Sequence, residues 1–457
     1  MRRIAVLSAA SLMAAIILAP RAQAQGFAVY EHDPCMMARG GAGVAAPCAG
    51  GSAIFFNPAG IVAAGKRFNL EANLTLIQPK GQFTDSASRT VTNLKNATYP
   101  VPAGYATYQL SSKAAIGFGA FAPYGLTTEW SPTYPGRFMA YKTQLASIYW
   151  QPTFAYQLAP GFQIGVGVDY VTASAKVHRR VDLSTITVPG QVFPFALLGV
   201  PVGTDFADAL FDVSGHGWGG HVGVIWQASS KLSFGIRYQS QVKVNFTGTA
   251  SFTQVQTGLT LPAGNPLGLP GGTPIDALLT PNFAPDSLLG SQSASTSITM
   301  PDQLVVGLAY KVTPRLSVMV DYQFTDWSKF KSLDLALAKA PAVSMYENYG
   351  NTNALRAGLE WNPAGALEVR AGILTHNGAS PAETVTPILP EGQRFEGTVG
   401  LGIPLSDWLR LDVAYQYLQQ ADRHGRMVDA PVPTTALNSG LFHFTGNLFG
   451  ASLALAF

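Results

Sequence analysis

The chain of 457 residues is 47% hydrophobic, yet only 12% of its residues are Asp, Glu, Lys or Arg. A soluble protein usually has a charged fraction of about 25%, so the composition argues against an ordinary soluble domain. The formal net charge of +3 is spread thinly, which argues against nucleic acid as a partner. The 47 Gly and 17 Tyr residues fit a chain of many strands, many turns and aromatic girdles.

The chain opens with the pattern of a secretory signal. Arg2 and Arg3 precede the apolar run Ile4–Pro20, and Ala22–Ala24 supplies a small-x-small cleavage site. A membrane anchor is the alternative, but the run is slightly short, and no later segment has the roughly twenty apolar residues of a spanning helix. We therefore predict a signal peptide over 1–24 and export to the bacterial outer membrane.

The segment Gln25–Lys66 has no strand alternation. A stretch of this length before a barrel is either a disordered tail or a plug folded into the lumen. Its apolar residues are too many for a solvated tail, so we predict a hatch that plugs the lumen over 25–66.

Fourteen segments then alternate apolar and polar residues, and most are long enough to cross a bilayer at a tilt, which takes roughly 9–11 residues. They are Arg67–Pro79, Tyr99–Leu110, Lys113–Tyr124, Thr143–Leu158, Phe162–Arg179, Trp218–Gln227, Lys231–Thr247, Ser297–Tyr310, Arg315–Asp326, Asn353–Trp361, Ala366–His376, Arg394–Ile403, Trp408–Gln419 and Phe442–Phe457. The last one ends in an aromatic residue with no charge after it, as the closing strand of an outer-membrane barrel does.

The phase of the alternation assigns the faces of the strands. Leu409, Leu411 and Val413 point one way, toward lipid, whereas Arg410 and Asp412 point toward the lumen. Short turns alternate with long loops, which requires an even number of strands and leaves both ends of the barrel in the periplasm. The sequence predicts an all-β fold, a transmembrane antiparallel β-barrel of about 14 strands over 67–457.

The two longest predicted loops, Arg180–Gly217 and Gly248–Thr296, are unusually apolar. They either pack on each other as a cap or form a groove that collects hydrophobic molecules, and both are compatible with the composition. The candidates for ligand contact in these loops are Phe193, Phe195, Leu278 and Leu279.

Several segments resemble the FadL family of outer-membrane hydrophobe transporters. The resemblance lies in Gly26-Phe27, Ala38–Gly43, Ile54–Gly60, Ile116–Trp130, Phe162–Arg179 and Asp326–Phe330, and it extends over the mature chain apart from the longest loops. It implies ligand capture between the third and fourth extracellular loops, followed by lateral release through a kink in the third strand.

Pro123 and Gly125 fall where that kink is expected. Proline cannot donate to a ladder and glycine invites a bulge, although Pro123–Gly125 is also compatible with a strand that simply ends. The hatch is expected to cover the kink and to move when ligand arrives. The residues expected to act there are Phe27, Asn57, Pro58, Ala59 and Gly60.

Motifs for chemistry are sparse. We predict no cofactor, no metal site and no enzymatic activity, and we interpret His216 and His221 as surface residues. Cys35 and Cys48 both lie in the hatch, and the oxidising periplasm favours a disulfide between them over free thiols. This pair departs from the hatch pattern of the family and suggests a hatch fastened to itself.

The predicted function is passive uptake of long-chain fatty acids or related hydrophobes by a monomer, whose partners are the ligand and outer-membrane lipid. Arg179 matches a basic position at the end of the family's fifth strand and is the first candidate for the ligand carboxylate, ahead of Arg180, Lys329 and Arg394. The alternatives are uptake of aromatic hydrocarbons, a general porin and an outer-membrane lipid hydrolase.

Overall fold

The computed structural model describes residues 26–63, 65–363, 367–425 and 439–457. The predicted signal peptide lies outside these residues, as do Ala364, Gly365 and the first residue of the strand expected from Ala366. Within the described residues no helix has both the length and the hydropathy needed to span a membrane.

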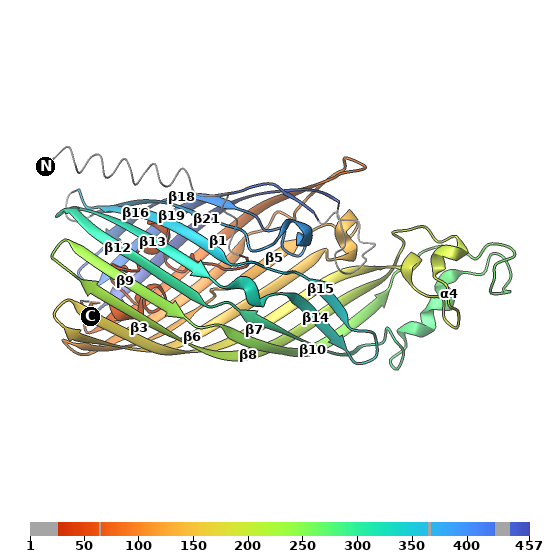
Figure 1. Cartoon of the computed structure of the whole chain (residues 1–457), viewed down its shortest axis with the longest axis horizontal. Coiled ribbons are helices and arrows are strands. Elements are labelled where there is room, and N and C mark those ends of the chain that lie inside the picture. Colours follow the sequence, from red (N-terminus) through yellow and green to blue (C-terminus); the bar gives the residue numbers. More distant parts are fainter. Residues whose placement is uncertain (1–25, 64, 364–366, 426–438) are drawn as a thin grey trace.

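The strands close into one antiparallel barrel, which Figure 1 shows along its length. Within the described residues fourteen spanning strands pair in a ring, and β1 pairs with both β3 and β21 to complete it. Three spanning strands are interrupted and carry two labels each. The spanning strands are β1 (Phe68–Asp85), β3 (Tyr99–Ser111), β4 and β5 (Ala114–Phe121 and Gly125–Glu129), β6 (Lys142–Ala159), β7 (Phe162–Asp182), β8 (Asp205–Gln227), β9 and β10 (Leu232–Gln239 and Val242–Gln254), β11 and β12 (Gln292–Met300 and Gln303–Thr313), β13 (Leu316–Thr325), β16 (Thr352–Trp361), β17 (Glu368–His376), β18 (Arg394–Pro404), β19 (Leu409–Gln420) and β21 (Gly440–Ala456). The predicted fold class is confirmed.

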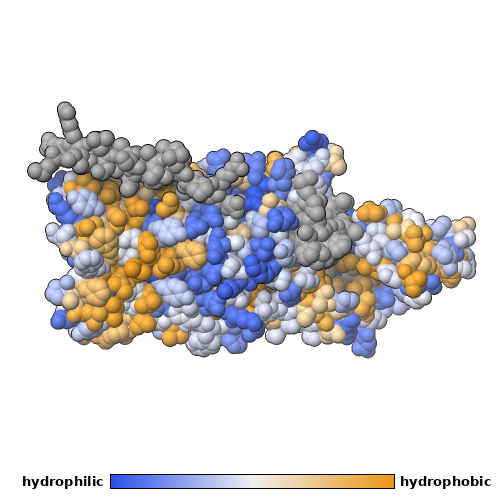
Figure 2. Space-filling view, in the orientation of Figure 1, coloured by the Kyte–Doolittle hydropathy of each residue, from blue (hydrophilic) through white to orange (hydrophobic). Residues whose placement is uncertain are grey.

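The predicted faces of the late strands are also confirmed. Along β19, Asp412, Ala414 and Gln416 are buried in the lumen, whereas Tyr417 is exposed. Figure 2 shows the consequence on the outside, where apolar residues gather on the half of the wall farther from the loop cap. Such a band is the surface that lipid requires.

The hatch lies inside the barrel, with three short helices: α2 (Pro34–Ala38), α3 (Ala53–Phe56) and the 3-10 helix η1 (Pro58–Ala63) (Figure 1). Helix α2 begins where a helix-capping sequence places it, because the Asp33 side chain accepts from Cys35 N–H at 2.6 Å and Pro34 occupies the first turn. Met37 and Ala38 pack against Ala414 and Leu448 of the wall.

The outer ends of β7 and β8 continue beyond the predicted strands and replace part of the first apolar loop. Phe211 and Val213 are buried residues of β8 that pair with Val177 and Ala175, so they face the interior of an extended wall. The remaining loop, 183–204, packs against loop 255–291 as a cap at the end of the barrel farthest from the C-terminus (Figure 1).

The other elements lie outside the spanning wall or in its loops. Alternation did not predict the hairpin of β14 and β15, whose strand β14 pairs with β11 beyond the end of β13. These elements are β2 (Val91–Asn93), η2 (Pro135–Phe138), η3 (Leu183–Thr185), η4 (Phe195–Leu198), α4 (Ile275–Leu279), η5 (Thr280–Phe283), η6 (Trp327–Lys329), β14 (Ser332–Leu337), β15 (Val343–Tyr346), η7 (Ala382–Thr384) and β20 (Arg423–His424).

Candidate ligand-binding site

The wall has a gap between its second and third strands. The ladder of β3 with β4 runs up to the pair Gly104–Ala120 and ends there, while β5 pairs only with β6 among the described residues. The next residues of β3, up to Tyr99, pair with β1 alone. We call this gap the window.

The hatch covers the kinked backbone beside the window. Ala28 forms a β-bridge with Tyr124, Val29 N–H donates to Pro123 O at 2.8 Å, and Gly125 N–H donates to Phe27 O at 3.0 Å. The backbone groups released by the kink are therefore paired from inside, which a wall that faces lipid requires.

Asn57–Gly60 lies elsewhere than expected. The Asn57 side-chain amide donates to Val44 O at 2.7 Å and to Val224 O at 3.0 Å, and Pro58 packs over Gly165 of β7. This segment fastens the hatch to itself and to the β7–β8 wall. The hydrogen bonds of the Asn57 side chain therefore account for this residue without any contact at the window.

A cavity of about 790 Å³ lies behind the window, and we call it the window cavity. Its lining is mainly apolar and comes from the hatch, from both sides of the window and from the lipid-exposed side of β6. Representative lining residues are Phe27, Pro100, Pro102, Phe121, Leu126, Leu145, Ile148 and Leu389. Because Ile148 and Pro102 belong to the exposed outer face of the wall, the cavity reaches from the hatch to that face.

One end of the window cavity is polar. Arg394 Nε donates to Gln420 Oε1 at 3.3 Å, and His376 Nε2 lies 3.1 Å from Glu396 Oε1. Arg356 is committed to structure, because its guanidinium stacks 3.8 Å from the ring centroid of Tyr30. Among the described residues Arg394 forms no ion pair.

Arg179 does not line the window cavity. It is paired with Ala209 at the outer end of β7, and its Nε is buried without a hydrogen-bond partner in the described structure. The pairing of strands far apart in the chain decides which cations line the apolar cavity.

A second apolar cavity of about 60 Å³, which we call the upper cavity, lies toward the cap. Val177, Phe211 and Leu335 line it. Phe27, Leu126, Leu145 and Leu389 line both cavities, so these four side chains separate them.

The loop residues selected from the sequence lie in the cap. Phe195 and Leu279 are fully buried in its core, and Phe193 and Leu278 pack against that core. The cap interpretation of the apolar loops is thus satisfied by contacts between the loops themselves.

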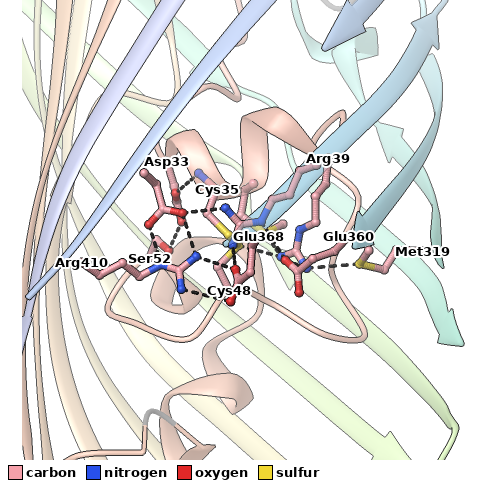
Figure 3. Close-up of a disulfide and its surroundings, with 12 residues drawn as sticks. Asp33, Cys35, Arg39, Cys48, Ser52, Met319, Glu360, Glu368 and Arg410 are labelled. Carbon is pink, nitrogen blue, oxygen red and sulfur yellow. Dashed lines mark hydrogen bonds and ion pairs between the residues drawn. A yellow bond between two sulfur atoms is a disulfide. The ribbon is translucent and has the colours of Figure 1, made fainter. Parts of the chain in front are cut away.

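The periplasmic half of the hatch is held by a disulfide and by ionic contacts (Figure 3). Cys35 and Cys48 are bonded, and Arg39 Nη2 lies 2.7 Å from Cys48 Sγ. Arg39 also reaches Glu360 of the wall at 3.7 Å. Burial raises the pKa of Asp33, while the hydrogen bonds from Ser52 and the Cys35 N–H oppose the shift.

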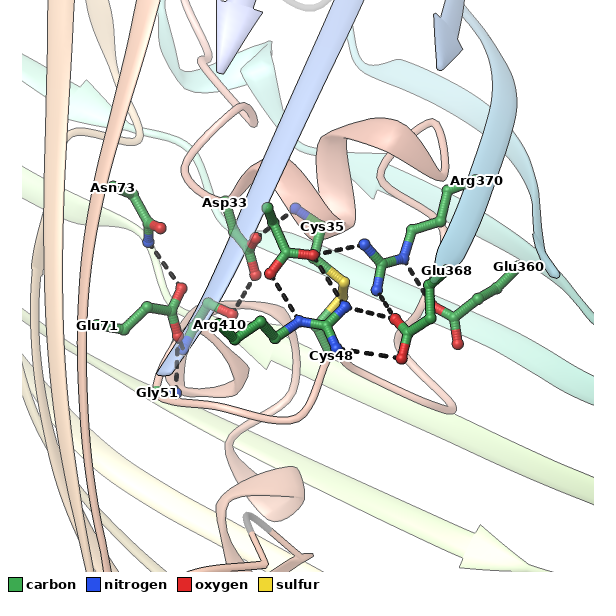
Figure 4. Close-up of polar contacts among 12 residues, drawn as sticks. Asp33, Cys35, Cys48, Gly51, Glu71, Asn73, Glu360, Glu368, Arg370 and Arg410 are labelled. Atoms are coloured by element: carbon green, nitrogen blue, oxygen red, sulfur yellow. Dashed lines mark hydrogen bonds and ion pairs between the residues drawn. A yellow bond between two sulfur atoms is a disulfide. The ribbon is translucent and has the colours of Figure 1, made fainter. Parts of the chain in front are cut away.

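Figure 4 extends this network across the lumen. Arg370 binds Glu360 at 2.7 Å and Asp412 at 2.6 Å, and Glu71 accepts from Gly51 N–H at 2.9 Å. These groups border a polar cavity of about 300 Å³. Wall and hatch are therefore joined by charged groups here and by apolar contacts at the window cavity.

His221 is not a surface residue as predicted. It is buried, with Nδ1 2.5 Å from Asp169 Oδ1 and Nε2 2.9 Å from Thr153 Oγ1. The hydroxyl, imidazole and carboxylate are in the order that a hydrolase uses, but none of the three cavities described above includes them. The inward position follows from the parity of β8, which places His221 opposite Gly167.

Comparison with known proteins agrees with this architecture. The chain is 24% identical to Outer membrane protein P1 of Haemophilus influenzae over 97% of this chain and 98% of that protein. It is 22% identical to the long-chain fatty acid transport protein of Escherichia coli over 97% of each. Among solved structures it resembles a Pseudomonas aeruginosa FadL homologue, with a TM-score of 0.78, 20% identity and coverage of 95% of this chain and 100% of that one.

The toluene transporter TodX of Pseudomonas putida is similar in fold as well, with a TM-score of 0.67, 17% identity and coverage of 94% and 99%. The family model described as outer membrane protein transport protein (OMPP1/FadL/TodX) matches residues 15–457, nearly the whole chain. With its closed fourteen-stranded barrel, its internal hatch and this match, the chain belongs to the OMPP1/FadL/TodX family of outer membrane transport proteins.

Proposed function

We propose that this protein takes up long-chain fatty acids or related hydrophobic molecules passively, and releases them sideways into the outer membrane through the window. The observation that carries the proposal is the window cavity, whose apolar lining extends from the hatch to the lipid-exposed face of the wall. An amphiphile that enters such a cavity never has to bring its tail into water.

The proposed route begins at the cap. Ligand collects on the apolar loops between β7 and β8 and between β10 and β11, passes the upper cavity and reaches the window cavity once Phe27 moves. Movement of Phe27 breaks few backbone hydrogen bonds, since Val29 N–H and Gly125 N–H bond this end of the hatch to the kink and Gly26 N–H donates to Glu391. The barrel itself keeps its ladder.

We propose Arg394 as the group that receives the ligand carboxylate, because it lies at the polar end of the window cavity without an ion-pair partner among the described residues. Arg179 remains the alternative, as a headgroup contact on the way in. Uptake of neutral aromatic hydrocarbons is the second candidate function, supported by the fold shared with the toluene transporter TodX. A neutral substrate would need neither cation.

The test is uptake of labelled oleate and of labelled toluene by cells that lack other hydrophobe transporters and carry either this chain or an empty vector. We expect oleate uptake to rise severalfold with the chain. Arg394→Gln should lower oleate uptake about tenfold, the loss of one charge-assisted hydrogen bond, and leave toluene uptake unchanged.

Arg179→Gln is the matched control for loss of a lumenal guanidinium. If it lowers oleate uptake more than Arg394→Gln does, the carboxylate site lies at the outer end of β7 instead. If toluene uptake rises with the chain and oleate uptake does not, the second candidate function is correct.

A further inference from the structure

The window begins at a particular place in the ladder. Gly104 of β3 pairs with Ala120 of β4, and the two strands separate at the next residues toward the cap. The kink at Pro123 explains why the third strand departs. It does not explain why β3 offers no N–H donors along its freed edge.

The hydrogen bonds between β3 and β1 fix which residues of β3 face that edge. Gln109 N–H donates to Arg67 O at 2.8 Å, on the β1 side, and the pairing of β1 with β3 continues without a register shift up to Tyr99. Successive residues of a strand point their N–H groups to opposite neighbours. The odd-numbered residues of β3 therefore face β1, and the even-numbered ones face β4 and the window.

The first two even-numbered residues beyond Gly104 are Pro102 and Pro100. Neither has an N–H group, so the ladder toward the third strand loses its donors at two consecutive positions. The same prolines remove no hydrogen bond to β1, because the intervening residues Val101 and Ala103 supply the donors on that side. The window-facing edge is thus depleted of donors while the β1-facing edge stays intact.

The two sides of the window are equally long. Beyond it, Lys95 N–H donates to Glu129 O at 2.7 Å, and Lys95 Nζ lies 2.8 Å from Glu129 Oε1. From Gly104 to Lys95 and from Ala120 to Glu129 the chain takes nine steps on each side of the window. The pairs at the two ends of the window therefore share one register.

We infer that Pro100 and Pro102 hold the window open, by withholding the two backbone donors with which β3 would otherwise bind the third strand. They are positioning residues for release of the ligand, and their role in transport rests on the lateral exit proposed above. Both line the window cavity, so the edge that they leave unpaired is also the edge that a ligand tail passes.

The test replaces both prolines with residues that favour strands, in the variant Pro100→Thr/Pro102→Thr. Hydrogen–deuterium exchange of the purified protein, followed on peptides covering 99–104, reports whether the two new amides are paired. Labelled oleate uptake by cells reports transport. Pro152→Thr, an exposed proline of β6 on the outer wall, is the matched control.

We expect the new amides to exchange at least a hundredfold more slowly than unpaired amides and oleate uptake to fall about tenfold, while Pro152→Thr transports normally. Amides that exchange freely would overturn the inference, whatever the uptake. Protected amides with normal uptake would confirm the role of the prolines and contradict the lateral exit. The heat-dependent gel mobility of the barrel checks folding, and single substitutions at either proline replace the pair if it does not fold.

Discussion

His32 is the residue whose chemistry is most at odds with its surroundings. Its ring packs between the rings of Phe55 and Phe121, with centroid distances of 4.7 and 5.3 Å. Burial lowers the pKa of His32 to about 3, and the nearby Arg237 charge adds to the shift. The neutral imidazole therefore packs as an apolar ring between the hatch and the kinked strand, and protonation at low pH disfavours that packing.

We expect acidification to loosen the hatch through His32. In the unfolded chain the imidazole takes up a proton below about pH 6.5, whereas in the hatch it stays neutral down to about pH 3. Stability contributed by the neutral form is full above pH 6.5 and is lost progressively as the pH falls. At pH 4.5 the loss is about 3 kcal/mol.

Proteolysis of the hatch in a urea series, at pH 7 and at pH 4.5, measures this effect. His32→Leu should remove most of the difference between the two pH values. The neighbouring Asp33, whose pKa burial raises, titrates in both proteins and so cancels in the comparison. An unchanged pH dependence in His32→Leu would show that another group is responsible.

At the scale of elements, the hatch consists of two differently held parts. The part from Asp33 to Ser52 is closed by the Cys35–Cys48 disulfide and joined to the wall through Arg39 and Glu71. The part at Gly26–Val29 is held by backbone hydrogen bonds to the kink, by the bond from Gly26 N–H to Glu391, and by ring contacts of Phe27 with Trp327 and Phe330. A ligand that disturbs the second part leaves the first part in place.

Removing the disulfide should free the first part. In Cys35→Ser/Cys48→Ser the free energy of unfolding of the hatch should fall by about 3 kcal/mol, the value for a cross-link that closes a loop of roughly 15 residues. The melting temperature of the barrel should not change. Urea-dependent cleavage of the hatch measures the first quantity and heat-dependent gel mobility the second. Reduction of the unmodified protein with dithiothreitol is the control and should reproduce the variant. A hatch equally resistant in both would mean that the ionic contacts alone hold it.

Alternation in the sequence was sufficient to predict the spanning strands and, for β19, the lumenal face that carries Asp412. Alternation did not predict the outer ends of β7 and β8. Their inward-facing side chains, such as Phe211, are apolar, so the sequence there resembles an apolar loop. Alternation also misplaced His221. The position of a lumenal charge depends on which distant strands the closed sheet brings together, and periodicity carries no such information.

For the whole molecule, the hatch and its ionic network predict a barrel with low ionic conductance. The polar cavity between hatch and wall measures about 300 Å³, and the hatch residues around it are tied to the wall by Arg39 and by Gly51. We expect the intact protein in a planar bilayer to carry at most a small, flickering ionic current. A barrel that keeps only residues 67–457 should conduct steadily. A large steady current from the intact protein would favour a general porin.

The equal lengths of the two sides of the window have a consequence for how this barrel evolves. The radius and tilt of a barrel follow from its strand number and its stagger, and an opening with equal arms changes neither. On the inference made above, two codons in β3, those of Pro100 and Pro102, separate a wall with an exit from a sealed one. Selection can therefore adjust how readily cargo leaves, or abolish release altogether, without altering the assembly of the other twelve strands.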